Sequence, residues 1–499
     1  MTQVHTVWKP GWIVVLSIAA LGGASSLVTA ADSPFVGSQT CNSVSCHGRS
    51  EPRRTSLGIG GASLQEFALF TQHDPHAAAA KTLVSPEFQA IVGRLSEVKD
   101  GPSTTNVYRQ CAQCHDPEGI AAAEQVSEPL LPLEVGHGTS SRGIHCESCH
   151  GGGKSWLATH YERDTSRSSL VAAGMRDTKS LKVRAELCAS CHVGSAERNV
   201  NHDMLAAGHP PLRFELAAYH RKLTSHNANG KQSHWNDARE RIRTKDFEVK
   251  LWEAGQLASA NAALTLLESR AHRAALEVKE NIGTGVAPWP EFAEYDCFRC
   301  HQRLQPDQFN RKSPAAGMPE WGIWNLSLVA AAADTKELDA LRVEMKKSFV
   351  SEPAAVQVLA VTAKKSLVPS LFSEEATSRS LLDLSDRSPA GDKSWDALCK
   401  RYLAQRVAQK SVGDEFQKLE LVSKVAAAER TEFDALRQRI EGDLSTIAQQ
   451  LSFASPNNEW PRILVDGHEG SERFAKVESD LTAAAGKLRK LQSYVEQRR

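Results

Sequence analysis

The chain has 499 residues and carries 59 basic and 59 acidic side chains, so its formal net charge is zero. A chain of this length forms more than one core, since single hydrophobic cores rarely grow beyond about 250–300 residues. The balanced charge, without a long run of one sign, gives no support to nucleic-acid binding. We therefore expect two or three domains and partners other than nucleic acids.

The first thirty residues have the layout of an export signal. Basic side chains precede an apolar run from Trp12 to Leu21, and small residues follow up to Ala31. This pattern predicts a signal peptide over residues 1–31 and a periplasmic or otherwise exported mature protein. An uncleaved N-terminal membrane anchor is the alternative, although the apolar stretch is short for a span and rich in glycine and serine.

Ten of the eleven cysteines form five pairs, and each pair is followed directly by histidine. Four pairs read "CAQCH", "CESCH", "CASCH" and "CFRCH", whereas the first reads "CNSVSCH" with four intervening residues. In c-type cytochromes the two thiols bond the vinyl groups of haem and the adjacent histidine binds the iron. We therefore predict five covalently bound haem c groups. The attachment cysteines are Cys41, Cys46, Cys111, Cys114, Cys146, Cys149, Cys188, Cys191, Cys297 and Cys300, and the proximal iron ligands are His47, His115, His150, His192 and His301.

Two other uses of these cysteines have to be weighed. Small polar residues between Cys41 and Cys46 allow the longer loop to bulge outward, but an exported protein could also join these two thiols in a local disulfide. Zinc is the rival for the pairs as a group, yet it gives no reason for a histidine at the same offset five times. The eleventh cysteine, Cys399, lies on the apolar face of a predicted helix, and we expect a buried core thiol there.

Eleven further histidines lie between the first and last motifs, and only His468 follows them. Such crowding predicts that most of the five irons have histidine on both faces. In "QHDPHAAAAK", Asp74 is a predicted helix N-cap and Pro75 the first helical residue, which fixes His76 on the first turn.

Other histidines are candidates for the second axial position. In "VNHDMLAAGHPP", a short helix predicted to end at Gly208 is bracketed by His202 and His209, which suit two different irons. His160 follows the third motif closely, and His137 lies between glycines that allow close approach to a flat ring. His234 is a reserve candidate, whereas solvated side chains are expected for His220, His226 and His272.

These motifs resemble the cytochrome c554 family of tetrahaem electron carriers, which is related in haem packing to hydroxylamine oxidoreductase and pentahaem nitrite reductase. The resemblance rests on "CESCHG" with its trailing histidine, the preceding "PHAAA" and the following "CASCH", and it covers about residues 36 to 302. It implies that His76 and His160 are distal ligands and that the haems pack closely. The longer first motif and the additional fifth motif depart from the pattern. No CxxCK motif is present, which argues against nitrite reductase activity.

The remaining sequence predicts a mainly α protein with little regular sheet. Helices are expected over residues 85–99 and 235–281, the second bracing the haem-bearing part. Beyond the proline-rich bridge "RKSPAAGMPEW", helical periodicity dominates. We therefore predict a cytochrome domain over residues 32–312 and a helical bundle domain over residues 313–499.

Two apolar faces support the predicted bundle. One face contains Phe433, Leu436, Ile440, Leu444, Ile447 and Leu451, and the other contains Phe474, Val477, Leu481, Ala484, Leu488, Leu491 and Val495. The faces are expected to pack together as an antiparallel pair within the chain. A seam for self-association or complex assembly is the alternative.

The leading functional expectation is an exported pentahaem cytochrome that transfers electrons between exported or membrane-bound redox proteins. The alternative is a multihaem oxidoreductase of nitrogen or sulfur compounds, in which one five-coordinate iron binds substrate. A third possibility is an electron-transferring subunit whose C-terminal helices make the contacts of a larger complex.

Overall fold

The computed structural model describes residues 35–51, 64–97, 103–125, 143–224, 235, 238–280, 288–295, 321–329, 336–347, 350–367, 381–383, 395–421, 425–451 and 471–498. The predicted signal peptide, the domain boundary at residue 312, the fifth attachment motif, His137 and His234 lie outside these ranges. The described chain is mainly helical, without a strand, and an isolated antiparallel bridge joins Tyr295 to Trp321.

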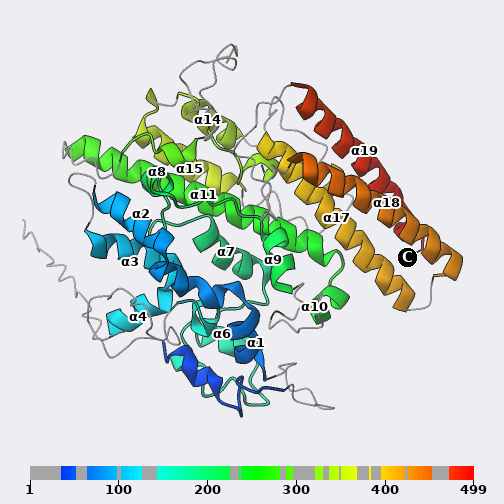
Figure 1. Cartoon of the computed structure of the whole chain (residues 1–499), viewed down its shortest axis with the longest axis horizontal. Coiled ribbons are helices and arrows are strands. Elements are labelled where there is room, and N and C mark those ends of the chain that lie inside the picture. The colour runs from blue at the N-terminus through cyan, green and yellow to red at the C-terminus, as the bar shows by residue number, and fades with distance from the viewer. Residues whose placement is uncertain are drawn as a thin grey trace, which may run out of the picture.

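Helices of very different length make up the fold (Figure 1). The first part contains η2 (Ser38–Asn42), α1 (Glu66–His73), η3 (Pro75–Val84), α2 (Pro86–Ser96), α3 (Thr104–His115), α4 (Pro117–Gln125), α5 (Cys146–His150), η4 (Gly153–Ser155), α6 (Arg167–Ala172), α7 (Leu181–His192), α8 (His202–Ala207), α9 (Leu216–Thr224) and α10 (Ala238–Arg243). The second part contains α11 (Phe247–Glu280), η6 (Phe292–Glu294), α14 (Lys336–Met345), α15 (Pro353–Leu367), α17 (Trp395–Leu421), α18 (Ala427–Leu451) and α19 (Ser471–Glu496).

Side-chain caps set the starts of the short helices as predicted. Ser85 accepts a hydrogen bond from the Phe88 amide at 3.1 Å at the start of α2, and Asp74 accepts from the His76 amide at 2.9 Å at the start of η3. Asn201 caps α8 in the same way, and Gly208 ends it with a left-handed φ of 117°. The prediction for residues 85–99 is confirmed at its start, although α2 ends at Ser96.

Helix α11 runs through the middle of the molecule and contacts α7, α9, α15 and α17 (Figure 1). Small side chains along it allow this close approach, and Gly255 lies against Leu216 of α9. Leu264 and Leu267 of α11 are fully buried in a cluster with Val356 and Ala360 of α15. The part of the chain that contains the attachment motifs therefore packs on a long helix, mainly through α7 and α9.

The predicted single helix over residues 235–281 is wrong at its beginning. Two helices, α10 and α11, meet at Asp246, whose φ of 51° is left-handed and therefore not helical. The Asp246 amide donates to Glu415 at 3.2 Å, and its carboxylate accepts from the Ser411 hydroxyl at 3.0 Å. Contacts with α17, which local propensity cannot reveal, thus stabilise the break.

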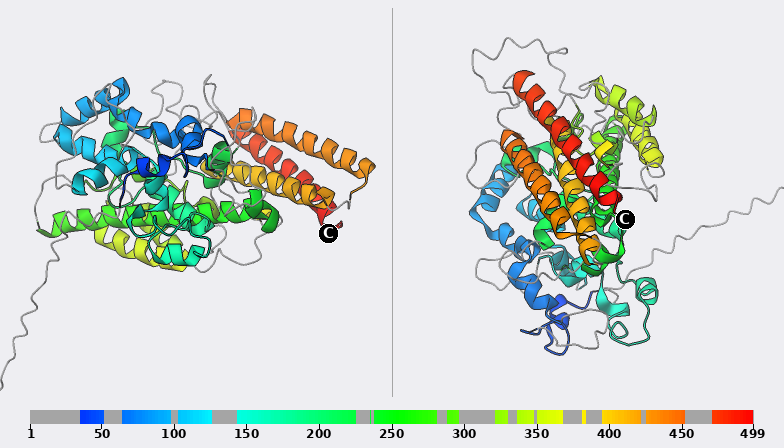
Figure 2. Two further views of the ribbon diagram at one scale, coloured as in Figure 1. Left: turned by 90° about the horizontal axis from the view of Figure 1, so that it is seen from below. Right: turned by 90° about the vertical axis from the view of Figure 1, so that its right-hand side faces the viewer.

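The C-terminal helices α17, α18 and α19 run side by side at one end of the molecule (Figure 2). Ile440, Leu444, Leu488 and Leu491 are fully buried among them, so the two predicted apolar faces pack together within the chain. Phe433 of α18 also stacks on Phe416 of α17, with ring centroids 3.6 Å apart. Intramolecular packing is confirmed, and self-association through other surfaces of these helices stays a prediction.

The bundle also shares its core with α9 and α11. Trp252 of α11 and Ala217 of α9 belong to the same buried cluster as α17. Cys399 is fully buried in that cluster, which confirms the prediction of a core thiol. No helix within the described ranges is long and apolar enough to cross a bilayer.

Replacing Leu444 by alanine tests the bundle core. Leu444 is fully buried, so Leu444→Ala removes packed methyl groups and leaves a cavity, and we expect a loss of about 2–5 kcal/mol in the free energy of unfolding. Leu421→Ala is the matched control, because this leucine at the end of α17 is 76% exposed. Urea unfolding followed by circular dichroism measures both, and equal losses would contradict the packing described.

Candidate haem centres

Three of the attachment motifs form the last turn of a helix. The second motif ends α3 at His115, the fourth ends α7 at His192, and the third is α5 itself. Residues three and four apart lie on one face of a helix, so the two sulfurs and the imidazole of each motif project to the same side. This placement suits attachment of one flat ring per motif.

The first motif reaches a similar arrangement through a longer loop. Backbone hydrogen bonds join the Cys46 amide to Ser43 O at 2.9 Å and the His47 amide to Cys41 O at 3.2 Å. Residues 42–45 are exposed, so the extra backbone bulges outward as predicted. No disulfide joins Cys41 to Cys46.

His47 of the first motif faces His160, with ring centroids 6.2 Å apart and ring planes inclined by 26°. The Nδ1 atom of His160 donates to Leu157 O at 2.6 Å, and that of His47 lies 2.8 Å from Glu66 Oε2. The hydrogen bond with Glu66 raises the pKa of His47. In both rings Nδ1 is occupied, so Nε2 is the nitrogen available to a metal.

His192 of the fourth motif faces His76, with centroids 6.0 Å apart and planes inclined by 82°. His76 is oriented by its Nδ1, which lies 2.8 Å from Asp74 Oδ1, and Asp74 also accepts from Trp235 Nε1 at 2.8 Å. Burial, followed by the charge of His76, lowers the pKa of His192 to about 4. His192 is therefore neutral at pH 7, the form in which imidazole binds metals.

His115 of the second motif lies close to His209. Burial lowers the pKa of His115, and the charge of His209 lowers it further. His115 Nδ1 lies 2.9 Å from Thr82 Oγ1, which itself donates to Ala79 O at 2.6 Å and so accepts from the ring. His209 Nδ1 donates to Pro210 O at 2.8 Å. In this pair too, the Nε2 atoms are the nitrogens available to a metal.

The separations of 6.2 and 6.0 Å fit an iron ion between the rings. Metal–imidazole bonds are about 2 Å long and each ring nitrogen lies about 1 Å from its centroid, so two axial imidazoles have centroids about 6 Å apart. Each pair offers two ligands, which is enough for an ion that brings four porphyrin nitrogens. Among the described residues, no group of three or more His, Cys, Asp or Glu side chains is arranged to hold a metal.

The predicted ligand His202 packs against the last described residues before the fifth motif. The ring of His202 contacts Phe292 at 5.5 Å between centroids, and its amide donates to Glu291 Oε1 at 2.9 Å. These contacts place His202 close to the segment that leads into the fifth motif. Cys297, Cys300, His301 and the candidate ligand His137 lie outside the described residues.

The prediction of a solvated His220 is wrong. This side chain is 1% exposed, and its Nε2 lies 3.0 Å from Arg184 Nη1. The signal was present in the sequence, because His220 follows buried Leu216 by one helical turn and therefore lies on the same face of α9. His272 is exposed, as predicted.

Sulfur contacts bring different motifs next to one another. A hydrogen bond with Cys146 lowers the pKa of Cys41, and a hydrogen bond with Cys191 raises the pKa of Cys114. Burial raises the pKa of Cys149 to about 12, and the charge of Cys188 raises it as well. The motifs are thus adjacent in the order first, third, fourth and second.

Burial also favours neutral sulfur at these positions. It raises the pKa of Cys111 to about 11 and that of Cys188 to about 12. A buried thiol with a raised pKa is a poor thiolate ligand for a metal. A thioether is uncharged, so the environment of these sulfurs suits covalent attachment to haem.

Buried polar contacts, which the sequence analysis missed, tie the first motif to the third. The Glu147 carboxylate of α5 accepts from the amides of Val36 at 2.9 Å, Gly37 at 2.8 Å and Gly153 at 2.7 Å. Glu118 accepts from the Ser38 hydroxyl at 2.8 Å and also from the Ser148 amide at 3.0 Å. These carboxylates hold the N-terminal segment against α5.

Arg198 connects the second motif to the fourth in a similar way. Arg198 donates to Gln113 O at 2.9 Å, within the second motif, and to the Ser190 hydroxyl at 2.8 Å, within the fourth. A hydrogen bond with Cys114 lowers the pKa of Cys191, and the charge of Arg198 lowers it further. Neither this arginine nor the two glutamates lies in a recognisable local pattern, because each acts between segments distant in sequence.

Comparisons with protein-family models, curated proteins and solved structures found no match to this chain. The assignment of a function therefore rests on the motifs and on the geometry of their histidines.

Gly48, which closes the loop of the first motif, offers a test of that loop. A Cβ atom at this position would overlap the carbonyl oxygen of Asn42, so Gly48→Ala should displace the loop and lower haem attachment at Cys41 and Cys46. Gly93→Ala is the control, since a Cβ atom there meets nothing within 4 Å. Mass analysis of the haem-bearing peptides measures occupancy, and full occupancy in Gly48→Ala would refute the requirement for glycine.

Proposed function

We propose that this chain is an exported c-type cytochrome that carries five covalently bound haems and transfers electrons between exported or membrane-bound redox proteins. The observation that carries the proposal is the pairing of proximal with predicted distal histidines, His47 with His160 and His192 with His76, at 6.2 and 6.0 Å between centroids. Histidine from both faces fills the axial positions of an iron and leaves no position for a substrate.

Haem iron supplies one-electron oxidation and reduction when it is bound. The chain's own residues attach the rings, hold the imidazoles and fix the spacing between sites. Cysteines of different motifs interact, the first with the third, the third with the fourth and the fourth with the second. These interactions support close packing of the attached haems. Close packing is also what the resemblance to the cytochrome c554 family implies.

Intact mass combined with electron paramagnetic resonance tests the proposal. The protein, purified from a host competent in cytochrome maturation, should have the mass of residues 32–499 plus five haems, and its oxidised irons should be mostly low-spin. A colourless protein with free thiols or bound zinc would refute it. A persistent high-spin iron that binds cyanide or nitric oxide would instead favour the oxidoreductase.

Alanine at position 160 tests the pairing of His160 with His47. Because His160→Ala removes one axial imidazole, one iron should change from low to high spin while the number of attached haems stays the same. His272→Ala is the control, because His272 is exposed on α11. Identical spin states in the two variants would contradict the assignment of His160 as a ligand.

A further inference from the structure

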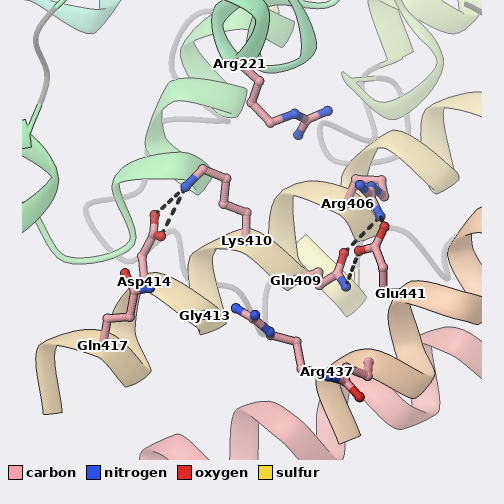
Figure 3. Close-up of a pocket in the computed structure, with 10 residues that line it drawn as sticks. Arg221, Arg406, Gln409, Lys410, Gly413, Asp414, Gln417, Arg437 and Glu441 are labelled. Carbon is pink, nitrogen blue, oxygen red and sulfur yellow. Dashed lines mark hydrogen bonds and ion pairs between the residues drawn. The ribbon is translucent and has the colours of Figure 1, made fainter. Parts of the chain in front are cut away.

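A pocket of about 510 Å³ lies between α9, α17 and α18, where the bundle meets the haem-bearing part. Figure 3 shows Arg221 reaching toward this space from α9 and Arg437 from α18 on the opposite side. All of its lining residues are polar or glycine. The pocket therefore suits a polar ligand and is separate from the histidine pairs.

Cationic side chains outnumber carboxylates in the lining. Arg221, Arg406, Lys410 and Arg437 line the pocket together with two acids, Asp414 and Glu441. Both acids already have cationic neighbours: Lys410 Nζ lies 3.1 Å from each Asp414 oxygen, and Arg406 Nη1 lies 2.7 Å from Glu441 Oε1. The lining thus carries more positive than negative charge.

Glu441 is shared among several groups. Besides Arg406, it accepts from Gln409 Nε2 at 3.0 Å, and the charge of Arg437 lowers its pKa as well. One carboxylate therefore faces two guanidinium groups. An added anion could contact Arg437 without displacing the bond between Arg406 and Glu441.

The environment on the α9 side also favours a negative ligand. Burial lowers the pKa of Arg221, and the charge of Arg406 lowers it further, although Glu215 opposes this. Glu215 is itself buried at the start of α9, where it accepts from the Ala218 amide at 2.7 Å. A bound anion would reduce the repulsion between the guanidinium groups.

The shape of the pocket leaves room for such a ligand. Gly413 of α17 lines it, and a Cβ atom at this position would meet nothing within 4 Å. Guanidinium groups bind carboxylate, sulfate and phosphate oxygens through paired hydrogen bonds. Two arginines on opposite walls suit a ligand with a negative charge at each end or on each face.

We propose that this pocket binds a small dianion, with Arg221 and Arg437 contacting its oxygens from α9 and α18. The ligand is either an inorganic oxyanion such as sulfate or a short dicarboxylate, and the shared chemistry is a pair of negative charges. Binding would link the bundle to the haem-bearing part, because the two arginines belong to different parts of the chain. This inference is independent of the proposed electron transfer.

Isothermal titration calorimetry of the full-length mature protein tests the proposal, with inorganic sulfate and succinate as separate probes at constant ionic strength. We expect saturable one-to-one binding of at least one probe, and the probe that binds more tightly identifies the ligand class. Arg437→Gln should weaken this binding by about tenfold or more, because it removes a charged donor. Arg439→Gln is the matched control, since this arginine lies on the same helix but does not line the pocket, and it donates to Ala435 O at 3.3 Å.

A second variant changes the wall of the pocket that α17 forms. Gly413→Glu places a carboxylate in the open space and replaces glycine by a better helix former, so the fold is retained while binding is lost. Circular dichroism verifies that both variants fold. Absence of binding by either probe, or equal binding by wild type, Arg437→Gln and Gly413→Glu, would overturn the proposal.

Discussion

The hydrogen bond made by Nδ1 of five of the candidate histidines is the interaction on which the site depends. Glu66, Leu157 O, Asp74, Thr82 and Pro210 O accept it in His47, His160, His76, His115 and His209 respectively. Each bond fixes the tautomer and prevents rotation of the ring, so that Nε2 is the nitrogen available to a metal. Several of these acceptors lie in short helices or at their ends. Asp74, for instance, caps η3 with the same carboxylate that orients His76.

The longer helices determine how the short ones meet. Helix α7 carries the fourth motif and packs on α11, which in turn packs on α15 and α17. Helix α11 thus contributes buried side chains both to the core of the bundle and to the cluster beneath α7. Asp246 belongs to the same connection, since its left-handed conformation is held by Ser411 and Glu415 of α17.

The sequence predicted correctly those features of the fold that depend on residues close together in the chain. The caps at Asp74, Ser85 and Asn201 and the apolar faces of α18 and α19 are examples, because a few neighbouring residues decide each of them. The sequence also singled out His76, His160 and His209, but it did not reveal which motif each would face. That pairing depends on contacts between distant segments, such as those of Glu147 and Arg198. The break at Asp246 escaped prediction for the same reason, whereas the burial of His220 could have been inferred from its helical spacing from Leu216.

The acceptors of the Nδ1 bonds differ in charge, and this difference has a consequence for the proposed cytochrome. His47 and His76 are bonded to carboxylates, whereas His115 and His209 are bonded to a hydroxyl and a carbonyl. An imidazole bonded to a carboxylate is more basic and donates more electron density to a metal. His47 and His76 would therefore each stabilise the ferric state of a bound iron more strongly than His115 or His209 would.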